Sequence, residues 1–228
     1  MVSKPYQRIA IQECGEPLVP IPLEQFTVVT PHPYAALGAP YGEHSPYYVR
    51  AGILKALGQA QHHLQTHKPG WQIQIFDAYR PIAVQQSMVD YTYAQLLESW
   101  QREHAAQTAP KDKLLTQVYQ FWAAPRHAAA TPPPHSTGAA IDITLVDARQ
   151  QGVDMGSAID EISERSYPNH FADKSEGKRF HHHRTLLAQA MQTAGFYQHP
   201  HEWWHFSLGD QLWAWLSNHS VARYGRAD

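Results

Sequence analysis

PHSTGAAIDITL, residues 134–145, is the stretch from which the fold of this 228-residue chain is predicted. Small or polar residues at 138, 140 and 142 alternate with apolar residues at 139, 141 and 143, which is the period of a β-strand. His135 lies on the loop that leads into this strand, and the polar face of the strand ends in Asp142. Both side chains are zinc-ligand types, so we expect the strand at 138–145 to carry part of a metal site.

Further strands and helices are predicted on either side of this stretch. Alternating or aromatic-rich segments at 71–76 and in the 202–206 region indicate two more strands. Apolar residues at helical spacing predict helices over about 47–67, 82–106, 111–122 and 181–194. This pattern favours an α+β fold, in which a central antiparallel sheet carries the site and helices pack on its outer face.

The length and composition are those of one domain. With 43% hydrophobic and 17% charged residues, the chain can bury one sizeable core, so residues 1–228 are predicted to form a single domain. Residues 1–46 are proline-rich with only short apolar pieces, and they are predicted to be an extended arm packed on that domain. The formal charge of −2 suggests neither nucleic acid nor an anionic membrane as partner, and it is compatible with a small or zwitterionic substrate.

The cysteine count and the apolar runs narrow the kind of site and its location. The single cysteine, Cys14, means that a metal site with several ligands must use His, Asp and Glu. We find no apolar run long enough for a signal-peptide core or a membrane span, and we therefore expect a cytoplasmic protein. Nothing in the sequence indicates an oligomeric state.

A second group of functional residue types occurs late in the chain, in the segment EWWH at 202–205. His135, Asp142 and His205 would supply two nitrogens and one oxygen, leaving the fourth position of a tetrahedral zinc for water. Zinc lowers the pKa of such a water towards about 7, and Glu202 is the candidate base that takes its proton. Arg80, at a predicted strand-to-helix junction, would stabilise the developing oxyanion, although an arginine there could equally pair with a structural carboxylate. Each of these patterns alone also fits a hydrogen-bonded core residue, and only the combination points to a zinc hydrolase.

Five motifs follow one another in the chain: DAYRP at 77–81, HxxGxAxD at 135–142, MGSxxD at 155–160, ERS at 164–166 and EWWHF at 202–206. Together they resemble the D-alanyl-D-alanine dipeptidases, zinc enzymes related to the D,D-carboxypeptidases and to the vancomycin-resistance dipeptidase. The resemblance implies that His135, Asp142 and His205 bind one zinc ion, that Glu202 is the catalytic base and that Arg80 stabilises the tetrahedral intermediate. It also implies that Asp160 binds the ammonium of a small dipeptide substrate.

One position departs from the family pattern. Pro133 stands where the family usually has a serine that contacts the substrate, and a proline has neither the hydroxyl nor a backbone N–H. This departure bears on substrate preference rather than on metal binding. The favoured function is zinc-dependent hydrolysis of the D-Ala-D-Ala dipeptide to two D-alanines, with N-acetylated and longer peptides rejected. The alternatives are a D,D-carboxypeptidase or endopeptidase acting on peptidoglycan stem peptides, and a catalytically inactive zinc-binding module.

Overall fold

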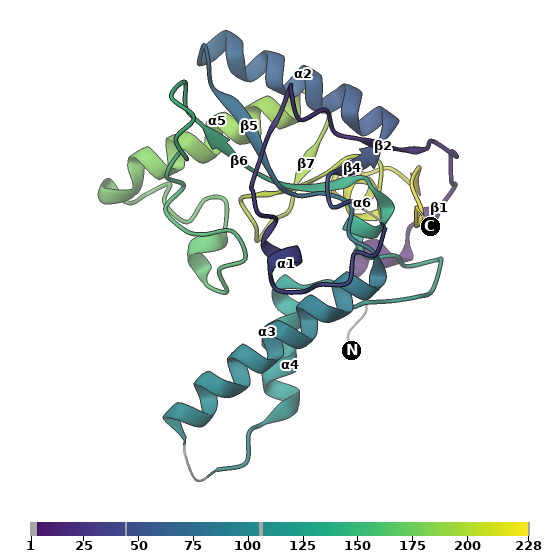
Figure 1. Ribbon diagram of the computed structural model, residues 1–228, viewed down its shortest axis with the longest axis vertical. Helices are drawn as coiled ribbons and strands as arrows, with labels where there is room; N and C mark the ends of the chain where they lie inside the picture. The colour runs from purple at the N-terminus through teal and green to yellow at the C-terminus, as the bar shows by residue number, and fades with distance from the viewer. Residues whose placement is uncertain (1–3, 44, 105–106, 228) are drawn as a thin grey trace.

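A five-stranded sheet forms the centre of the computed structural model (Figure 1), which describes residues 4–43, 45–104 and 107–227. Its strands, in spatial order, are β3 (Thr27–Val28), β5 (Gln72–Asp77), β6 (Ala140–Val146), β8 (His205–Ser207) and β7 (Tyr197–Gln198). Neighbouring strands from β5 to β7 are antiparallel, whereas β3 is parallel to β5. The prediction of an α+β fold is confirmed, but the predicted antiparallel sheet is wrong in one respect, because the sheet is mixed.

The parallel pair follows from the connection between β3 and β5. The chain passes through β4 (Tyr48–Arg50) and α2 (Ala51–His67) on the way, and a crossover containing a helix allows two successive strands of a sheet to run parallel. The helix predicted at 47–67 begins only at Ala51, because β4 pairs antiparallel with β2 (Leu18–Pro20). Pairing with a distant strand decided the state of residues 48–50, which a helical spacing alone could not show.

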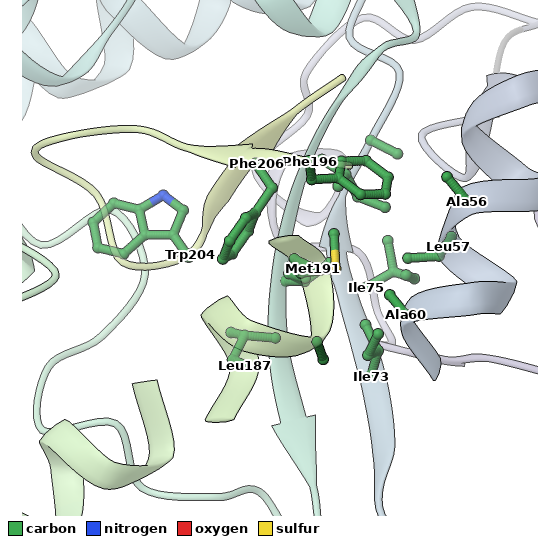
Figure 2. Packing of buried hydrophobic residues seen from close by; sticks show 14 of the residues in the cluster. Ala56, Leu57, Ala60, Ile73, Ile75, Leu187, Met191, Phe196, Trp204 and Phe206 are labelled. Atoms are coloured by element: carbon green, nitrogen blue, oxygen red, sulfur yellow. The ribbon is translucent and has the colours of Figure 1, made fainter. Parts of the chain in front are cut away.

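Two long helices pack on the sheet and on each other. These are α2 and α5 (Lys178–Thr193), and α5 begins at Lys178 rather than at residue 181 as predicted. Figure 2 shows Leu57 of α2 and Met191 of α5 facing Ile75 of β5, and all three side chains are completely buried. Each such side chain contributes about 1.5–3 kcal/mol to the free energy of unfolding, so this cluster holds the central strands in place.

The other two long helices do not lie on the sheet face. α3 (Ile82–Glu103) and α4 (Lys111–Phe121) form a hairpin that projects from the sheet (Figure 1), which differs from the predicted arrangement of helices on one outer face. The predicted end of α3 near residue 106 lies outside the described residues. At its base, the hairpin forms a second buried cluster that includes Val84, Val118 and Trp122.

Short elements complete the fold. In the predicted arm, η1 (Pro5–Arg8) packs on α6 (Gln211–Leu216), and β1 (Ala10–Ile11) pairs with β9 (Val221–Ala222). The remaining helical turns are α1 (Pro33–Ala36), η2 (Pro134–Thr137), η3 (Glu164–Ser166) and η4 (Ser175–Gly177). Within the described residues, no helix combines the length and the apolar character needed to cross a membrane.

Candidate active site and metal centre

The candidate metal ligands lie where β5, β6 and β8 run side by side. The strand register places Asp142 of β6 opposite His205 of β8 on one side and opposite Asp77 of β5 on the other. Directly opposite residues of antiparallel strands have Cβ atoms about 4.5–5.5 Å apart. The pairing of β6 with β8 therefore brings the Asp142 carboxylate and the His205 imidazole close enough to bind the same metal ion.

His135 reaches this place through the turn η2. The turn ends at Gly138, whose φ is 70°, a left-handed conformation that glycine adopts without strain. A Cβ at this position would also meet the end of the Leu18 side chain, which would have to move. The ring of His135 is then held by a hydrogen bond from its Nδ1 to the Ala78 carbonyl, at 2.7 Å.

Three possible ligand atoms converge at the end of β6. His135 Nε2 lies 3.2 Å from His205 Nδ1 and 3.2 Å from Asp142 Oδ2, and His205 Nδ1 lies 3.0 Å from Asp142 Oδ1. Two ligands that each lie about 2.1 Å from a tetrahedral zinc are separated by roughly 3.4 Å, so this set has the size of a zinc site. Among the described residues, no other group of His, Cys, Asp and Glu comes together in this way.

The two nitrogens that converge, His135 Nε2 and His205 Nδ1, are hydrogen-bond acceptors. We infer this from the partners of the other nitrogen of each ring. His135 Nδ1 donates to Ala78, while His205 Nε2 faces Ser207 Oγ at 3.4 Å. Ser207 in turn donates to Asp210 Oδ2 at 2.9 Å. With those ring nitrogens protonated, His135 and His205 present lone pairs to each other and to the Asp142 carboxylate. A buried group of three acceptors is stabilised by a cation, and two imidazoles with one carboxylate fit zinc.

Arg80 adjoins this group and is almost fully buried. Its Nη2 lies 2.7 Å from Asp77 Oδ2 and 3.3 Å from Asp142 Oδ2, and its Nη1 donates to Gln85 Oε1 at 3.0 Å. The arginine thus pairs with a carboxylate outside the candidate ligand group, Asp77, and it also reaches the edge of that group at Asp142. Its role in stabilising an oxyanion stays a prediction.

Glu202 lies in the turn that precedes β8, not in the strand as predicted. Its carboxylate oxygens lie 3.7 Å from His205 Nδ1 and 3.6 Å from His199 Nδ1, and it is not a member of the ligand group. Burial, with a further contribution from the charge of Asp142, raises the pKa of Glu202 well above its usual range. A cation bound by the three ligands would act in the opposite direction. A carboxylate that lies beside a metal site but is not one of its ligands can act as a general base, and this role of Glu202 stays a prediction.

Asp160 approaches the same cavity from the loop at 155–166. Its Oδ2 accepts a hydrogen bond of 2.7 Å from the Tyr34 hydroxyl, and its backbone has a φ of 63°. The loop is fastened near its start by Ser157, whose Oγ accepts hydrogen bonds from Arg184 at 3.0 Å and from the Trp203 indole at 2.9 Å. Through Ser157, the motif that carries Asp160 and the motif that carries Glu202 form one connected unit.

One cavity contains the whole set. Its volume is about 40 Å³, which is room for a few water molecules. All the predicted site residues line it: His135, Asp142, His205, Glu202, Arg80 and Asp160.

Comparison with known proteins identifies the family. The family model described as D-ala-D-ala dipeptidase matches residues 27–223. The chain belongs to this family. A D-alanyl-D-alanine dipeptidase of Synechocystis sp. is 49% identical and covers 99% of this chain and 97% of its own length. A D-alanyl-D-alanine dipeptidase of Enterococcus faecalis is 29% identical, covering 69% of this chain and 73% of its own length.

One solved structure is similar in outline. It is a mutant of the vancomycin-resistance D,D-pentapeptidase VanY in complex with Zn(II), with 14% identity and a TM-score of 0.45 over 95% of this chain and 96% of that chain. This likeness is too distant to inform the site. The match of the family model over residues 27–223 confirms the resemblance to the dipeptidases that the five motifs indicated.

Several residues that line the cavity of this dipeptidase family member were missed by the sequence analysis: Lys4, Tyr6, Gln85, Phe121, Trp122, Ala123, Pro134, His199 and Leu212. Of these, only His199 carried a local signal, because it lies three residues before Glu202. Trp204, which also lines the cavity, belongs to the EWWHF motif. Pro133, the position that departs from the family pattern, is buried and does not itself line the cavity, and Pro134 lies there instead.

Proposed function

We propose that this protein is a zinc-dependent dipeptidase that hydrolyses D-Ala-D-Ala to two D-alanines, with His135, Asp142 and His205 as the zinc ligands. The observation that carries the proposal is that three acceptors converge while Glu202 and Arg80 line the same cavity outside the ligand group. A structural zinc site is closed by a fourth protein ligand, whereas a catalytic site keeps one position open. Among the described residues the group has three ligands, and the carboxylate of Glu202 lies beside them without being a fourth. This arrangement favours the enzyme over an inactive zinc-binding module.

The chain's own residues supply the proton transfer and the charge stabilisation. Zinc, when bound, would lower the pKa of a water molecule and polarise the substrate carbonyl. Glu202 takes the proton of the water whose oxygen bonds to the carbonyl carbon, and it returns that proton to the amine nitrogen when the C–N bond breaks. Arg80 lines the cavity beside Asp142, and its positive charge would stabilise the oxygen of the attacked carbonyl as that oxygen becomes negative. Because Asp77 and Gln85 hold this guanidinium, it does not have to reorient during the reaction.

Asp160 is proposed to bind the ammonium of the dipeptide. The Tyr34 hydroxyl holds its carboxylate at the cavity, and the aromatic side chains of Trp122 and Trp204 narrow the space around the substrate. An N-acetylated dipeptide has no ammonium, and removal of one partner from a buried charge pair costs about 3–5 kcal/mol. The enzyme should therefore reject N-acetylated dipeptides and peptidoglycan stem peptides. The cytoplasmic location stays a prediction.

The test is the release of D-alanine by the purified full-length protein. We expect release from D-Ala-D-Ala that stops after treatment with a chelator and returns when zinc is added, because the open metal site is needed for turnover. N-acetyl-D-Ala-D-Ala and a pentapeptide stem are the matched controls, and we expect little or no cleavage of either. Efficient cleavage of the pentapeptide would instead identify a D,D-carboxypeptidase. Zinc binding without hydrolysis of any of the three substrates would identify an inactive zinc-binding module.

A further inference from the structure

The segment that begins at Lys4 borders the active-site cavity. Lys4 and Tyr6 line this cavity and also the two outer grooves beside it. Tyr6 is buried, and Gln211 of α6 donates a hydrogen bond of 2.6 Å to the Ile9 carbonyl. The backbone N–H of Lys4 donates to Gln7 Oε1 at 3.1 Å. Lys4 is thus held on an anchored segment as part of the cavity wall.

The charged side chains that line the cavity differ in whether they already have an ion-pair partner. Its carboxylates are Asp142, Asp160 and Glu202, and its lysine and arginine side chains are Lys4 and Arg80. Arg80 is already paired with Asp77 and Asp142. The ion pairs of Glu202 among the described residues go to His199 and His205, not to Lys4. The Lys4 ammonium is therefore the cation that can pair with a charge brought in by the substrate.

Lys4 and Asp160 lie near different residues around the candidate metal ligands. Lys4 and His199 line the same outer groove, and His199 Nδ1 lies 3.6 Å from a carboxylate oxygen of Glu202. Asp160 instead accepts a hydrogen bond from the Tyr34 hydroxyl, which in turn lies 3.4 Å from Arg80 Nη2. A cation on the Glu202 side and a carboxylate on the Arg80 side match the two ends of a free dipeptide, whose scissile bond lies between its ammonium and its carboxylate.

The terminal carboxylate of a dipeptide needs a donor or a cation in the wall of the cavity. Pro134, which forms part of that wall, has no backbone N–H to offer. We propose that Lys4 binds the terminal carboxylate of the substrate while Asp160 binds the ammonium. This inference rests on the proposed function and extends it to the second end of the substrate. It makes Lys4 a specificity-determining residue for a free carboxylate next to the scissile bond.

The experiment compares D-Ala-D-Ala with its C-terminal amide, D-Ala-D-alaninamide. In the full-length zinc enzyme we expect kcat/KM to favour the free acid, and in Lys4→Met we expect this preference to fall by about 10- to 100-fold, as for loss of a hydrogen bond between charged groups. The loss should fall mainly on KM of the acid, with the amide little changed. Lys4→Arg should keep most of the preference, and Lys55→Met, an exposed lysine of α2, is the matched control.

Two results would overturn the inference. If Lys4 acts only through Glu202, Lys4→Met will change kcat and the pH profile for both substrates alike, and the acid-to-amide preference will not move. The same comparison can be made without turnover, by calorimetric titration of each ligand into zinc-loaded Glu202→Gln protein with and without Lys4→Met. Acid affinity that does not depend on Lys4 would refute the inference, whereas failure of the wild type to hydrolyse either ligand would refute the proposed function instead.

Discussion

The two sides of the cavity are built in different ways. On the sheet side, Asp142 and His205 belong to paired strands, and the ring nitrogens that do not face the metal site have their own partners. On the loop side, Asp160 and Lys4 come from segments outside the five-stranded sheet. The strand register thus fixes Asp142 and His205, and the turn η2 with its bond to Ala78 fixes His135. The residues proposed for the two ends of the substrate can instead change with their loops while the sheet stays intact.

Two aspartates illustrate the same difference in electrostatic terms. Burial would raise the pKa of Asp142, but His135 and His205 hold it well below its usual range. Burial raises the pKa of Asp160 to about 7, and the charge of Asp142 adds to this rise. Asp142 therefore stays ionised, as the proposed metal ligand has to be, while Asp160 is a carboxylate whose charge is costly until a cation such as a substrate ammonium arrives.

The largest expected effects are on zinc content and turnover, and they distinguish His205 from Glu202, two residues of the EWWHF motif. His205→Ala should lose zinc and activity together, because a ligand is gone. Glu202→Gln should retain zinc while turnover falls by about 10²–10⁴-fold, because only the base is lost. The measurements are zinc content per chain by elemental analysis and kcat for D-Ala-D-Ala. Equal zinc loss in both variants would show that Glu202 is a ligand rather than the base.

A smaller effect is expected on the loop side. Asp160→Asn keeps an oxygen that can accept from Tyr34 but removes the charge, so KM for D-Ala-D-Ala should rise roughly 10- to 100-fold with zinc content unchanged. A raised carboxyl pKa also means that, as pH increases from the unfolded value towards about 7, the unfolded chain loses this proton before the folded one does. The wild type should lose stability over that range and remain less stable above it.

The pH dependence provides an independent check of Asp160. In the metal-free protein, the melting temperature of Asp160→Asn relative to wild type should be higher at pH 8 than at pH 5.5, since the variant has no carboxylate to ionise. Thermal unfolding in the presence of a chelator measures this difference. A constant difference at both pH values would show that Asp160 is already ionised in the folded protein at the lower pH.

The smallest effect concerns the residues behind the metal ligands. Ser207→Ala removes the oxygen that faces His205 Nε2 and that donates to Asp210. Loss of such a partner lowers metal affinity by about 10- to 100-fold, while turnover at saturating zinc should remain close to that of wild type. Competition with a chromophoric zinc chelator measures the affinity. Unchanged affinity would mean that the ladder alone orients the His205 ring.

The sequence could predict the parts of the fold that depend on local patterns. The alternation at 138–145 predicted β6 closely, and the apolar spacing at 111–122 predicted α4 to within one residue of its end. The errors occurred where a distant partner decided the outcome. Residues 48–50 form the strand β4, which pairs with β2, instead of the first turn of a helix. At the edge of the sheet, β3 pairs parallel with β5. A spacing rule contains no information about such partners.

The sequence by itself determined the family, through the five motifs, and it named the three residues that come together as a possible metal site. The types and spacing of His135, Asp142 and His205, with Glu202 three residues before the last of them, are the basis of the proposed ligands and base. These features are local, because ligand type and short spacing are written directly in the chain.

Only the tertiary structure decided what surrounds that set. It assigned the facing nitrogens of the two histidines through Ala78 and Ser207, and it joined Asp160 to Tyr34, 126 residues away in the sequence. It also placed Lys4 in the wall of the cavity that Glu202 lines. The physical reason is that the position of a side chain in a cavity depends on contacts between segments far apart in the chain, and on the burial that those contacts produce.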